Sequence, residues 1–534
     1  MDDSSKADIL NDFFVSVLTR EEPLEHSLDI EDSHVQNSIC DILITPDIVR
    51  GKLHKLKPNK ACGPDMVHVN VLRNTLELSI PLTYIYNLSL RTGHVPQDWR
   101  DANITPLFKK GSRTSANNYR PISLTSQAVK ILERIIQDSL IKHIDVNNII
   151  SCHQHGFQKS SSCVTQLIEC LNDWTESYDQ KIETDIIYLD FAKAFDSVPH
   201  QRLIQKIRST GVRGNLLRWI QAWLTDRRQR VVLPGASSSW KPVYSGVPQG
   251  SILGPVLFLL YVNDIPQQVH STVKMFADDT KLYRTVNSLD DCEKLQEDLN
   301  SLAAWANHWL LRFNEKKCTV LKIRQSIDYT FSLNGVTLQQ DTEQKDLGIT
   351  ISQTLKPDLH IANIVKKANS RIGLIKRCFT NYTPKKIQIL YTTMIRPLLE
   401  YGSTVWSPHL QKDILELDKV QRRCLRLTDN AITLPSLKDR REKQDICETY
   451  KYVNNLYNTD SSQLFSKSLT PTRGHSEKLE KHFSRTDIRK NFFVNRVVDT
   501  WNKQPQSIVS APSMYALKRR LRSPPDGEGD TAEK

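Results

Sequence analysis

Two short apolar runs near the middle of the chain end in aspartate, and they constrain the fold more than any other feature. Asp190 closes the run 186–189, whereas Asp278 and Asp279 follow a second run and precede the strand-like piece 281–283. The second pattern predicts a β-hairpin with an aspartate pair at its turn. Adjacent carboxylates at the ends of buried strands repel each other and lose hydration, which a divalent cation compensates. Oxygen ligands favour Mg²⁺ or Mn²⁺ over Zn²⁺.

A purely structural explanation of these residues stays open when they are taken alone. Asp278 and Asp279 could form an ordinary turn, and Asp190 could cap the N-terminus of a helix. The pattern of the surrounding chain therefore has to decide between a turn and a metal site.

Strand-like and helical stretches alternate between residues 183 and 352, which is typical of an α+β or α/β layer with helices on a sheet. The expected strands are 185–190, 230–233, 273–277, 319–323 and 347–351, and the expected helices are 201–224 and 290–312. The preceding part has mostly helical periodicity, as at 129–144, with turn-rich stretches at 57–65 and 109–121. After about residue 355 the chain returns to helix and becomes basic.

The bulk composition indicates an intracellular, globular protein. A 39% hydrophobic content is enough to bury large cores, and a net charge of +12 favours an acidic polymer such as nucleic acid, although a merely soluble basic protein is an alternative. Ten single cysteines indicate reduced thiols. The start is acidic, and the longest apolar run, 256–262, is too short to span a membrane. We therefore expect a soluble protein of the nucleus, the cytoplasm or both, with no membrane partner.

Several strings stand in an order that resembles the blocks of reverse transcriptases from non-LTR (LINE-type, jockey-like) retrotransposons. The central three are YLDFAKAFDSVPH (188–200), GVPQGSILGPVLFLLYVNDIP (246–266) and FADD (276–279). Upstream and downstream strings that look like further blocks are KPNKACGPD, WRDANITPLFKKG, NNYRPISLTS, LRFNEKKCTVLKI and KDLGITIS. Similarity to the region that follows the polymerase continues in LEYGSTVWSPHL and FFVNRVVDTWNKQPQSIVSAPS. The resemblance covers residues 5 to 522.

This resemblance implies an α+β, right-hand polymerase with a palm sheet backed by helices and a helical C-terminal region. The implied division is a leader at 1–46, fingers with the first palm elements at 47–182, a palm at 183–352, a helical thumb at 353–430, a further helical region at 431–522 and a disordered tail at 523–534. The implied activity is RNA-directed DNA synthesis from an RNA template, a DNA primer and dNTPs.

The catalytic and metal-binding positions follow by matching the blocks. Asp190, Asp278 and Asp279 are implied as catalytic residues that bind two Mg²⁺ ions, or Mn²⁺, with help from the backbone carbonyl of Phe191. Such a metal pair promotes in-line displacement at phosphorus, so little general-base chemistry by side chains is needed.

The blocks also imply contacts to the incoming nucleotide. Arg120 and one of Lys109 and Lys110 match cations that hold the triphosphate, and arginine suits this role because it meets phosphate oxygens with two donors. Gln249 is expected to face the nucleotide and the template. Lys317 matches a lysine that protonates the leaving pyrophosphate, with Lys316 as the alternative.

Phe195 is the position most informative about the sugar. A bulky ring below the sugar leaves no room for a 2′-hydroxyl and would select deoxynucleotides. Simple core packing against Phe191 is the alternative, because the two residues lie at helical spacing.

A basic stripe in the expected thumb can be recognised without the resemblance. Lys419, Arg422, Arg423 and Arg426 fall on one face of a predicted helix, next to an apolar stripe of Leu417, Val420, Cys424 and Leu427. Such a face can follow a phosphate backbone without reading sequence, although a solvated helix surface is an equal alternative.

Elements of this family commonly carry an endonuclease before the polymerase, and the sequence leaves no room for one and contains no CCHC knuckle. We therefore expect a fragment or a truncated element copy, with the primer source and the oligomeric state left open. A catalytically silent relic that only binds nucleic acid is the alternative function. An RNA replicase is disfavoured by Phe195 and by FADD in place of a Gly-Asp-Asp centre.

Overall fold

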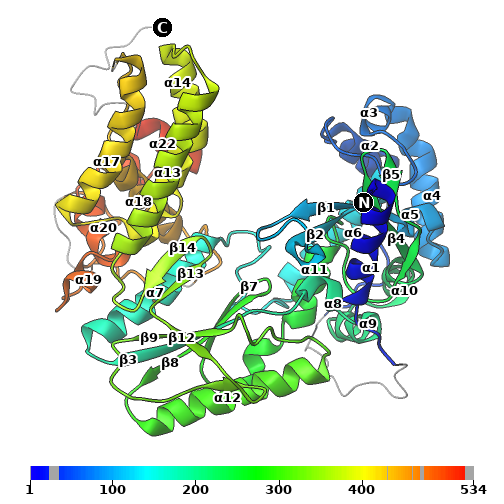
Figure 1. The fold of residues 1–534 in the computed structure, drawn as a ribbon, viewed down its shortest axis with the longest axis horizontal. Helices are drawn as coiled ribbons and strands as arrows, with labels where there is room; N and C mark the ends of the chain where they lie inside the picture. The colour runs from blue at the N-terminus through cyan, green and yellow to red at the C-terminus, as the bar shows by residue number, and fades with distance from the viewer. Residues whose placement is uncertain are drawn as a thin grey trace.

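A mixed fold of helices and sheets is seen in the computed structural model, which describes residues 2–22, 35, 37–429, 431–459, 461–468 and 474–522. The tail expected at 523–534 lies outside the described residues. A central sheet forms the base, and two largely helical blocks rise from its two sides (Figure 1). Among the described residues, none of the helices has both the length and the apolar character needed to cross a bilayer.

The central sheet has five strands in the order β12-β9-β3-β8-β7. Its strands are β3 Glu183–Leu189, β7 Thr272–Phe276, β8 Asp279–Val286, β9 Thr319–Ile323 and β12 Gln339–Asp341. Neighbouring strands run antiparallel except for the parallel β12–β9 pair. β3 lies at the centre, and its C-terminal end delivers Asp190.

Alternate side chains of β3 enter two different hydrophobic cores. Ile187 and Leu189 pack in the core that contains α11 (Gly254–Val262) and α12 (Leu289–His308), whereas Ile186 and Tyr188 pack in the core that contains α7 (Cys163–Asp179). Successive side chains of a strand point to opposite faces, so helices cover both faces here. All seven residues of β3 are buried, which fixes the position of the residue that follows.

A second sheet lies in the block that carries the N-terminus (Figure 1). Its path is β2-β1-β4-β5, with β6 paired to β4 and β1 parallel to β4. Its strands are β1 Ala102–Phe108, β2 Tyr119–Leu124, β4 Arg227–Leu233, β5 Ala236–Ser237 and β6 Lys241–Val243. The shorter elements and helices around it are α1 Asp3–Ser16, α2 Pro46–His54, α3 Val69–Asn74, η1 Leu76–Leu78, α4 Ser79–Thr92, α5 Gln97–Arg100, η2 Ala116–Asn118, α6 Gln127–Val146, α8 Ala194–Ser197, α9 His200–Ser209, α10 Gly214–Leu224 and η3 Ile265–Gln268.

Helix α1 lies within the segment 1–46 and is packed against the second sheet. Asn11 of α1 is buried, donates a hydrogen bond to Ser238 Oγ (3.0 Å) and accepts one from Gln229 Nε2 (3.1 Å). The hydrogen bonds satisfy both ends of the buried amide, as burial of a polar group requires. The first described residues are therefore joined to β4 and to the segment that follows β5.

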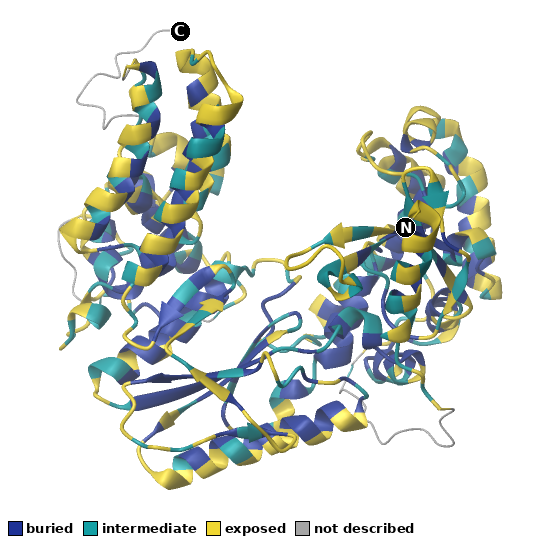
Figure 2. Ribbon diagram, viewed as in Figure 1, coloured by how far each residue is buried: buried dark blue, intermediate teal, exposed yellow. Residues whose placement is uncertain are grey.

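The second block is helical and contains the C-terminus (Figure 1). Its elements are α13 Asp358–Cys378, α14 Pro384–Leu390, the π-helix η4 Tyr391–Ile395, α15 Arg396–Glu400, α16 Ser403–Trp406, α17 Gln411–Leu425, η5 Arg426–Thr428, α18 Leu437–Val453, η6 Ser461–Gln463, α19 Asp487–Lys490, α20 Phe493–Asn502, α21 Gln506–Val509 and α22 Met514–Arg520. The short strands β10 Ser332–Leu333, β11 Val336–Thr337, β13 Glu343–Asp346 and β14 Ile349–Ser352 precede it. Figure 2 shows exposed residues along α13 and α17 and a central sheet that is buried over most of its strands.

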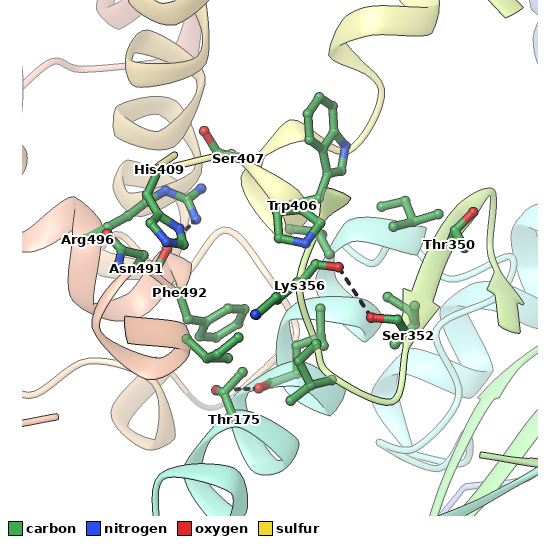
Figure 3. A pocket seen from close by; sticks show the side chains of 17 residues that line it. Thr175, Thr350, Ser352, Lys356, Trp406, Ser407, His409, Asn491, Phe492 and Arg496 are labelled. Atoms are coloured by element: carbon green, nitrogen blue, oxygen red, sulfur yellow. Dashed lines mark hydrogen bonds between the residues drawn. The ribbon is translucent and has the colours of Figure 1, made fainter. Parts of the chain in front are cut away.

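Arg496 of α20 ties the C-terminal helices to the rest of this block. Its guanidinium donates to both carboxylate oxygens of Asp445 (3.0 Å each) and to the carbonyl of Thr404 (2.7 Å). Beside it lies a cavity of about 60 Å³ whose lining comes from α7, β14, α16 and α20 (Figure 3). Residues 488–496 thus pack where α7, β14 and α16 meet.

Most elements expected from periodicity are confirmed, including the strands at 319–323 and 273–277 and the helices at 129–144 and 290–312. The helical stretch expected at 201–224 is confirmed, but it is divided into two helices, α9 and α10. Gly211 lies between them with φ +82°, a left-handed conformation that ends the first helix. Strands β1 and β2 were not expected, since the region around them was taken as helices and turns.

Candidate active site

The three aspartates lie at the same end of neighbouring strands. Asp190 directly follows β3, and the pairing of Leu189 with Thr280 sets it beside the start of β8. β7 and β8 form the expected hairpin, in which Phe276 pairs with Asp279 and the turn contains Asp278. The sequence expectation of an aspartate pair at a hairpin turn is therefore confirmed.

The carboxylates are close enough to influence one another's protonation. Burial raises the pKa of Asp278, and the negative charge of Asp190 raises it further. Burial, Asp278, Asp346 and Asp190 together raise the pKa of Asp279 to about 6. A positive charge at this place would relieve the repulsion, which is the electrostatic condition for a divalent cation site.

The Asp190 carboxylate forms an ion pair with Lys317. Lys317 Nζ lies 2.8 Å from Asp190 Oδ2, and the backbone N–H of Asn314 donates to the Asp190 carbonyl at 2.7 Å. In the described part of the chain, no three carboxylate, imidazole or thiol side chains converge closely enough to hold a metal ion between them. The side chains of the three aspartates offer only oxygen ligands, and such ligands fit Mg²⁺ or Mn²⁺ better than Zn²⁺.

Phe191 pairs with Phe313 next to the aspartate. The rings stack at 4.5 Å, and the flanking hydrogen bonds run from Ala192 N to Arg312 O and from Asn314 N to Asp190 O. This antiparallel pattern leaves the Phe191 carbonyl out of the pairing, so its oxygen stays available at the strand end.

The hairpin turn rests on a segment that the sequence reasoning did not assign to the site. Gln154 Oε1 accepts hydrogen bonds from the backbone N–H of Ala277 (2.8 Å) and of Gly156 (2.7 Å), and the neighbouring backbone pairs with Met275. A Cβ at Gly156 would come within 2.3 Å of the Ala277 nitrogen. Ala277 itself has φ +58°. The segment therefore holds the turn before Asp278 in a conformation that it would not keep unaided.

Phe195 lies in α8, which follows the aspartate strand. Its ring stacks on Phe258 at 4.4 Å and meets Phe157 edge-on at 6.4 Å. The ring is half-buried, so it is packed on its Phe258 side and partly open to solvent. This geometry is compatible both with core packing and with contact to a sugar.

Gln249 occupies a turn that is fastened to helix α8 and to strand β2 of the second sheet. Its Nε2 donates to Asp196 Oδ1 at 2.8 Å, and its carbonyl accepts from the backbone N–H of Ser123 in β2 at 2.7 Å. Gly250 has φ +120°, and a Cβ there would come within 2.6 Å of the Ser123 carbonyl oxygen. Only glycine suits this close approach. Burial raises the pKa of Asp196, a residue that the sequence reasoning did not single out.

The paired strands β1 and β2 bring cations toward the aspartates. Leu107 pairs with Arg120, and Lys109 N donates to the carbonyl of Asn118 at 2.8 Å. Partial burial and the nearby charges of Arg120, Lys193 and Lys317 lower the pKa of Lys109, whereas Asp190 raises it. Burial likewise lowers the pKa of Lys193, which sequence reasoning missed. Lys110 follows as an exposed residue.

The basic helix at 411–425 has the expected two faces. Leu417, Val420 and Cys424 are buried, whereas the cations beside them are exposed. Arg423 donates to Asn369 of α13 at 2.9 Å, so this side chain is partly held in place. The apolar stripe is confirmed, and the structure places the cationic stripe away from the central aspartates, in the helical block (Figure 1).

Comparison with known proteins decides what kind of domain contains this arrangement. Residues 108–351 match the family described as reverse transcriptase (RNA-dependent DNA polymerase). This range resembles a reverse transcriptase domain. The matched range begins at the last residue of β1 and contains β2, all three aspartates and the whole central sheet, so the resemblance seen in the sequence blocks is confirmed.

Similar proteins come from insect mobile elements. A probable RNA-directed DNA polymerase from transposon BS of Drosophila melanogaster is 28% identical over 76% of this chain and 47% of its own length. The RNA-directed DNA polymerase from mobile element jockey of the same species is 29% identical over 75% of this chain and 45% of its own length. A probable RNA-directed DNA polymerase from transposon X-element is 28% identical over 69% of this chain and 42% of its own length. The chain thus spans about half the length of the curated relatives it matches.

Proposed function

We propose that this chain is an RNA-directed DNA polymerase of a mobile element, which extends a DNA primer on an RNA template by transfer of nucleotidyl groups from dNTPs. One observation carries the proposal. Asp190, Asp278 and Asp279 lie at adjoining strand ends inside a region that matches reverse transcriptases, and their negative charges repel one another, which a cation would relieve. Nucleotidyl transfer needs this concentration of negative charge to hold metal ions beside phosphate.

In this proposal the three aspartates hold two Mg²⁺ ions, with Mn²⁺ as a substitute and the Phe191 carbonyl as a further ligand. The bound ions would supply the charge neutralisation that an in-line displacement at phosphorus requires. The raised pKa values of Asp278 and Asp279 support this role, because a bound cation would offset the repulsion and lower both pKa values again. Lys317 would give up its ion pair with Asp190, so that Asp190 could bind the metal. Its ammonium group would then protonate the departing pyrophosphate.

The remaining site residues would position the nucleotide. Arg120 and Lys109 would hold the triphosphate, and Lys109 is preferred over Lys110 because its pKa responds to Asp190 and to the other cations. Phe195 would close the space below the sugar against a 2′-hydroxyl, supported from behind by Phe258. Gln249 would face the base pair from a turn that Asp196 steadies.

The proposed layout is that of a right hand. Residues 47–182 would be the fingers with the first palm elements, 183–352 the palm and 353–430 the thumb, followed by a helical region at 431–522. The exposed Lys419, Arg422, Arg423 and Arg426 would contact the phosphates of the template and product. Because these are backbone contacts, binding there would be insensitive to sequence and sensitive to salt.

Primer extension tests this proposal directly. The wild type is expected to add deoxynucleotides to a DNA primer on an RNA template in the presence of Mg²⁺, and Asp278→Asn is expected to abolish the addition. Asp487→Asn is the matched control, because Asp487 is an exposed aspartate in α19. Loss of activity in the control alone, or equal activity in all three proteins, would refute the proposed site. If the wild type is inert but binds RNA in a salt-sensitive manner, the chain is a silent, nucleic-acid-binding relic.

A further inference from the structure

A cavity rich in lysine lies next to the turn that contains Gln249 and Gly250. It has a volume of about 280 Å³ and is formed by α2, the loop that follows it, α6 and the turn around Gly250 and Ile252. Six of its lining side chains are cationic, and none is acidic: Lys52, Lys55, Lys57, Lys60, Lys130 and Arg134. We call this feature the lysine cavity.

The charge of the lysine cavity is largely uncompensated. Lys52 forms an ion pair with Asp138, but no described carboxylate forms an ion pair with Lys55, Lys57, Lys60 or Arg134. Burial lowers the pKa of Lys130, and Glu133 only partly opposes this effect. Cations gathered this closely repel one another, and a bound polyanion relieves that repulsion.

The cavity wall formed by the loop after α2 is fixed to α6. Gln127 Nε2 donates to the carbonyl of Ala61 at 2.6 Å. A Cβ at Gly63 would come within 2.5 Å of the Ser126 nitrogen, so the loop lies directly on the start of the helix. Lys57 and Lys60 are therefore carried on a loop with a defined position rather than on a free one.

The opposite wall is fixed to the same helix and leads to the active site. Glu133 is fully buried, and its carboxylate accepts hydrogen bonds from the backbone N–H of Ile252 (2.7 Å) and Leu253 (3.4 Å). Gln137 Nε2 donates to the carbonyl of Ile252 at 3.1 Å. Helix α6 thus connects the cationic loop rigidly to the turn that begins with Gln249.

We propose that the lysine cavity binds the phosphates of the single-stranded RNA template just before the template reaches Gln249. This inference rests on the proposed polymerase function. Gly250 connects the two sites, because it lines the cavity and directly follows Gln249 in the chain. Cations supplied by two separate segments, 52–60 and 130–134, suit a run of phosphates better than one isolated anion. Lysine binds phosphate as a point charge and reads no base, which suits a strand whose sequence changes at every step.

The test compares templates that differ only in the length of the unpaired 5′ overhang ahead of the primer terminus. The variant is Lys57→Ala with Lys60→Ala, both exposed loop residues. The matched control is Arg73→Ala with Arg91→Ala, two exposed cations of α3 and α4 that lie outside the cavity lining. Template affinity and extension are measured with an overhang of about 10 nucleotides and with almost none.

In the wild type, the affinity gained from the overhang is expected to fall about sevenfold between about 50 and 200 mM salt if two phosphate contacts are made. The Lys57/Lys60 variant is expected to lose this salt-dependent gain and to retain wild-type extension on the template without an overhang. The Arg73/Arg91 control is expected to keep the gain. An unchanged gain in the lysine variant, or an equal loss on both templates, would overturn the inference.

Photocrosslinking separates a failure of this inference from a failure of the proposed function. A photoactivatable uridine in the overhang is expected to label the peptide that contains Lys57 and Lys60, with or without polymerase activity. Labelling without extension would leave the binding site standing and refute polymerisation. Extension without labelling would refute the lysine cavity as a template site. If inorganic phosphate alone abolished the labelling completely, the cavity would be a site for free anions, which would also refute the inference.

Discussion

Breaking the buried ion pair beside the β7–β8 hairpin should destabilise the protein strongly. Lys281 Nζ donates to both carboxylate oxygens of Asp346, at 3.0 and 2.7 Å, and the two side chains are only 2% and 4% exposed. Burial lowers the pKa of Lys281, but Asp346, Cys170 and Asp279 together outweigh this effect, so the pKa is raised. The pair joins β8, which starts at Asp279, to β13.

The size of the effect follows from what each substitution leaves behind. Lys281→Met leaves Asp346 buried without its cation, and Asp346→Asn leaves Lys281 buried without its anion. Removing one partner of a buried pair costs about 3–5 kcal/mol, whereas replacing both with apolar side chains is often close to neutral. We therefore expect each single variant to lower the free energy of unfolding by about 3–5 kcal/mol, and Lys281→Met with Asp346→Leu to lower it by less than either.

Urea denaturation followed by circular dichroism measures these differences as shifts of the unfolding midpoint. Lys294→Met is the control, because Lys294 forms a solvent-exposed pair with Asp290 on α12, and it should unfold like the wild type. If Lys281→Met also unfolded like the wild type, or if the double variant lost the sum of the two single effects, the pair would not act as described.

Two further changes probe the active site itself. Phe195→Val should remove the ring below the sugar and reduce the preference for deoxynucleotides over ribonucleotides by about 10- to 200-fold, measured by single-nucleotide extension; unchanged preference would assign Phe195 to core packing. Gly156→Ala should displace the Ala277 backbone, which lies 2.3 Å from the new Cβ, and reduce the rate of extension by about 100-fold with little loss of helical signal. Gly373→Ala, which meets no atom within 4 Å, should keep full activity, and equal activity of the two alanine variants would contradict the role of Gly156.

Local patterns in the sequence were sufficient to predict the strands that carry the aspartates. The apolar run before Asp190 and the hairpin around Asp278 depend on side chains that are neighbours in the chain, so periodicity and turn chemistry could identify them. The basic and apolar faces of α17 were predictable for the same reason, because residues three and four apart share a helix face.

Contacts between distant segments explain what the sequence did not reveal. β1 pairs with β4, more than a hundred residues later, and without that partner its residues lack a strong strand pattern. Gln154 supports the Ala277 turn across 123 residues, and no local signal connects the two. Asp196 was visible in the sequence as one more acidic residue, and only its burial beside Gln249 indicates a positioning role.

Binding of Mn²⁺ to the protein, followed by electron paramagnetic resonance, tests the central claim most directly. If Asp190, Asp278 and Asp279 jointly hold divalent cations, Asp190→Asn and Asp278→Asn should each weaken Mn²⁺ binding about tenfold or more, and Asp487→Asn should bind as the wild type does. Equal Mn²⁺ affinity in the wild type and in all three variants would contradict the account.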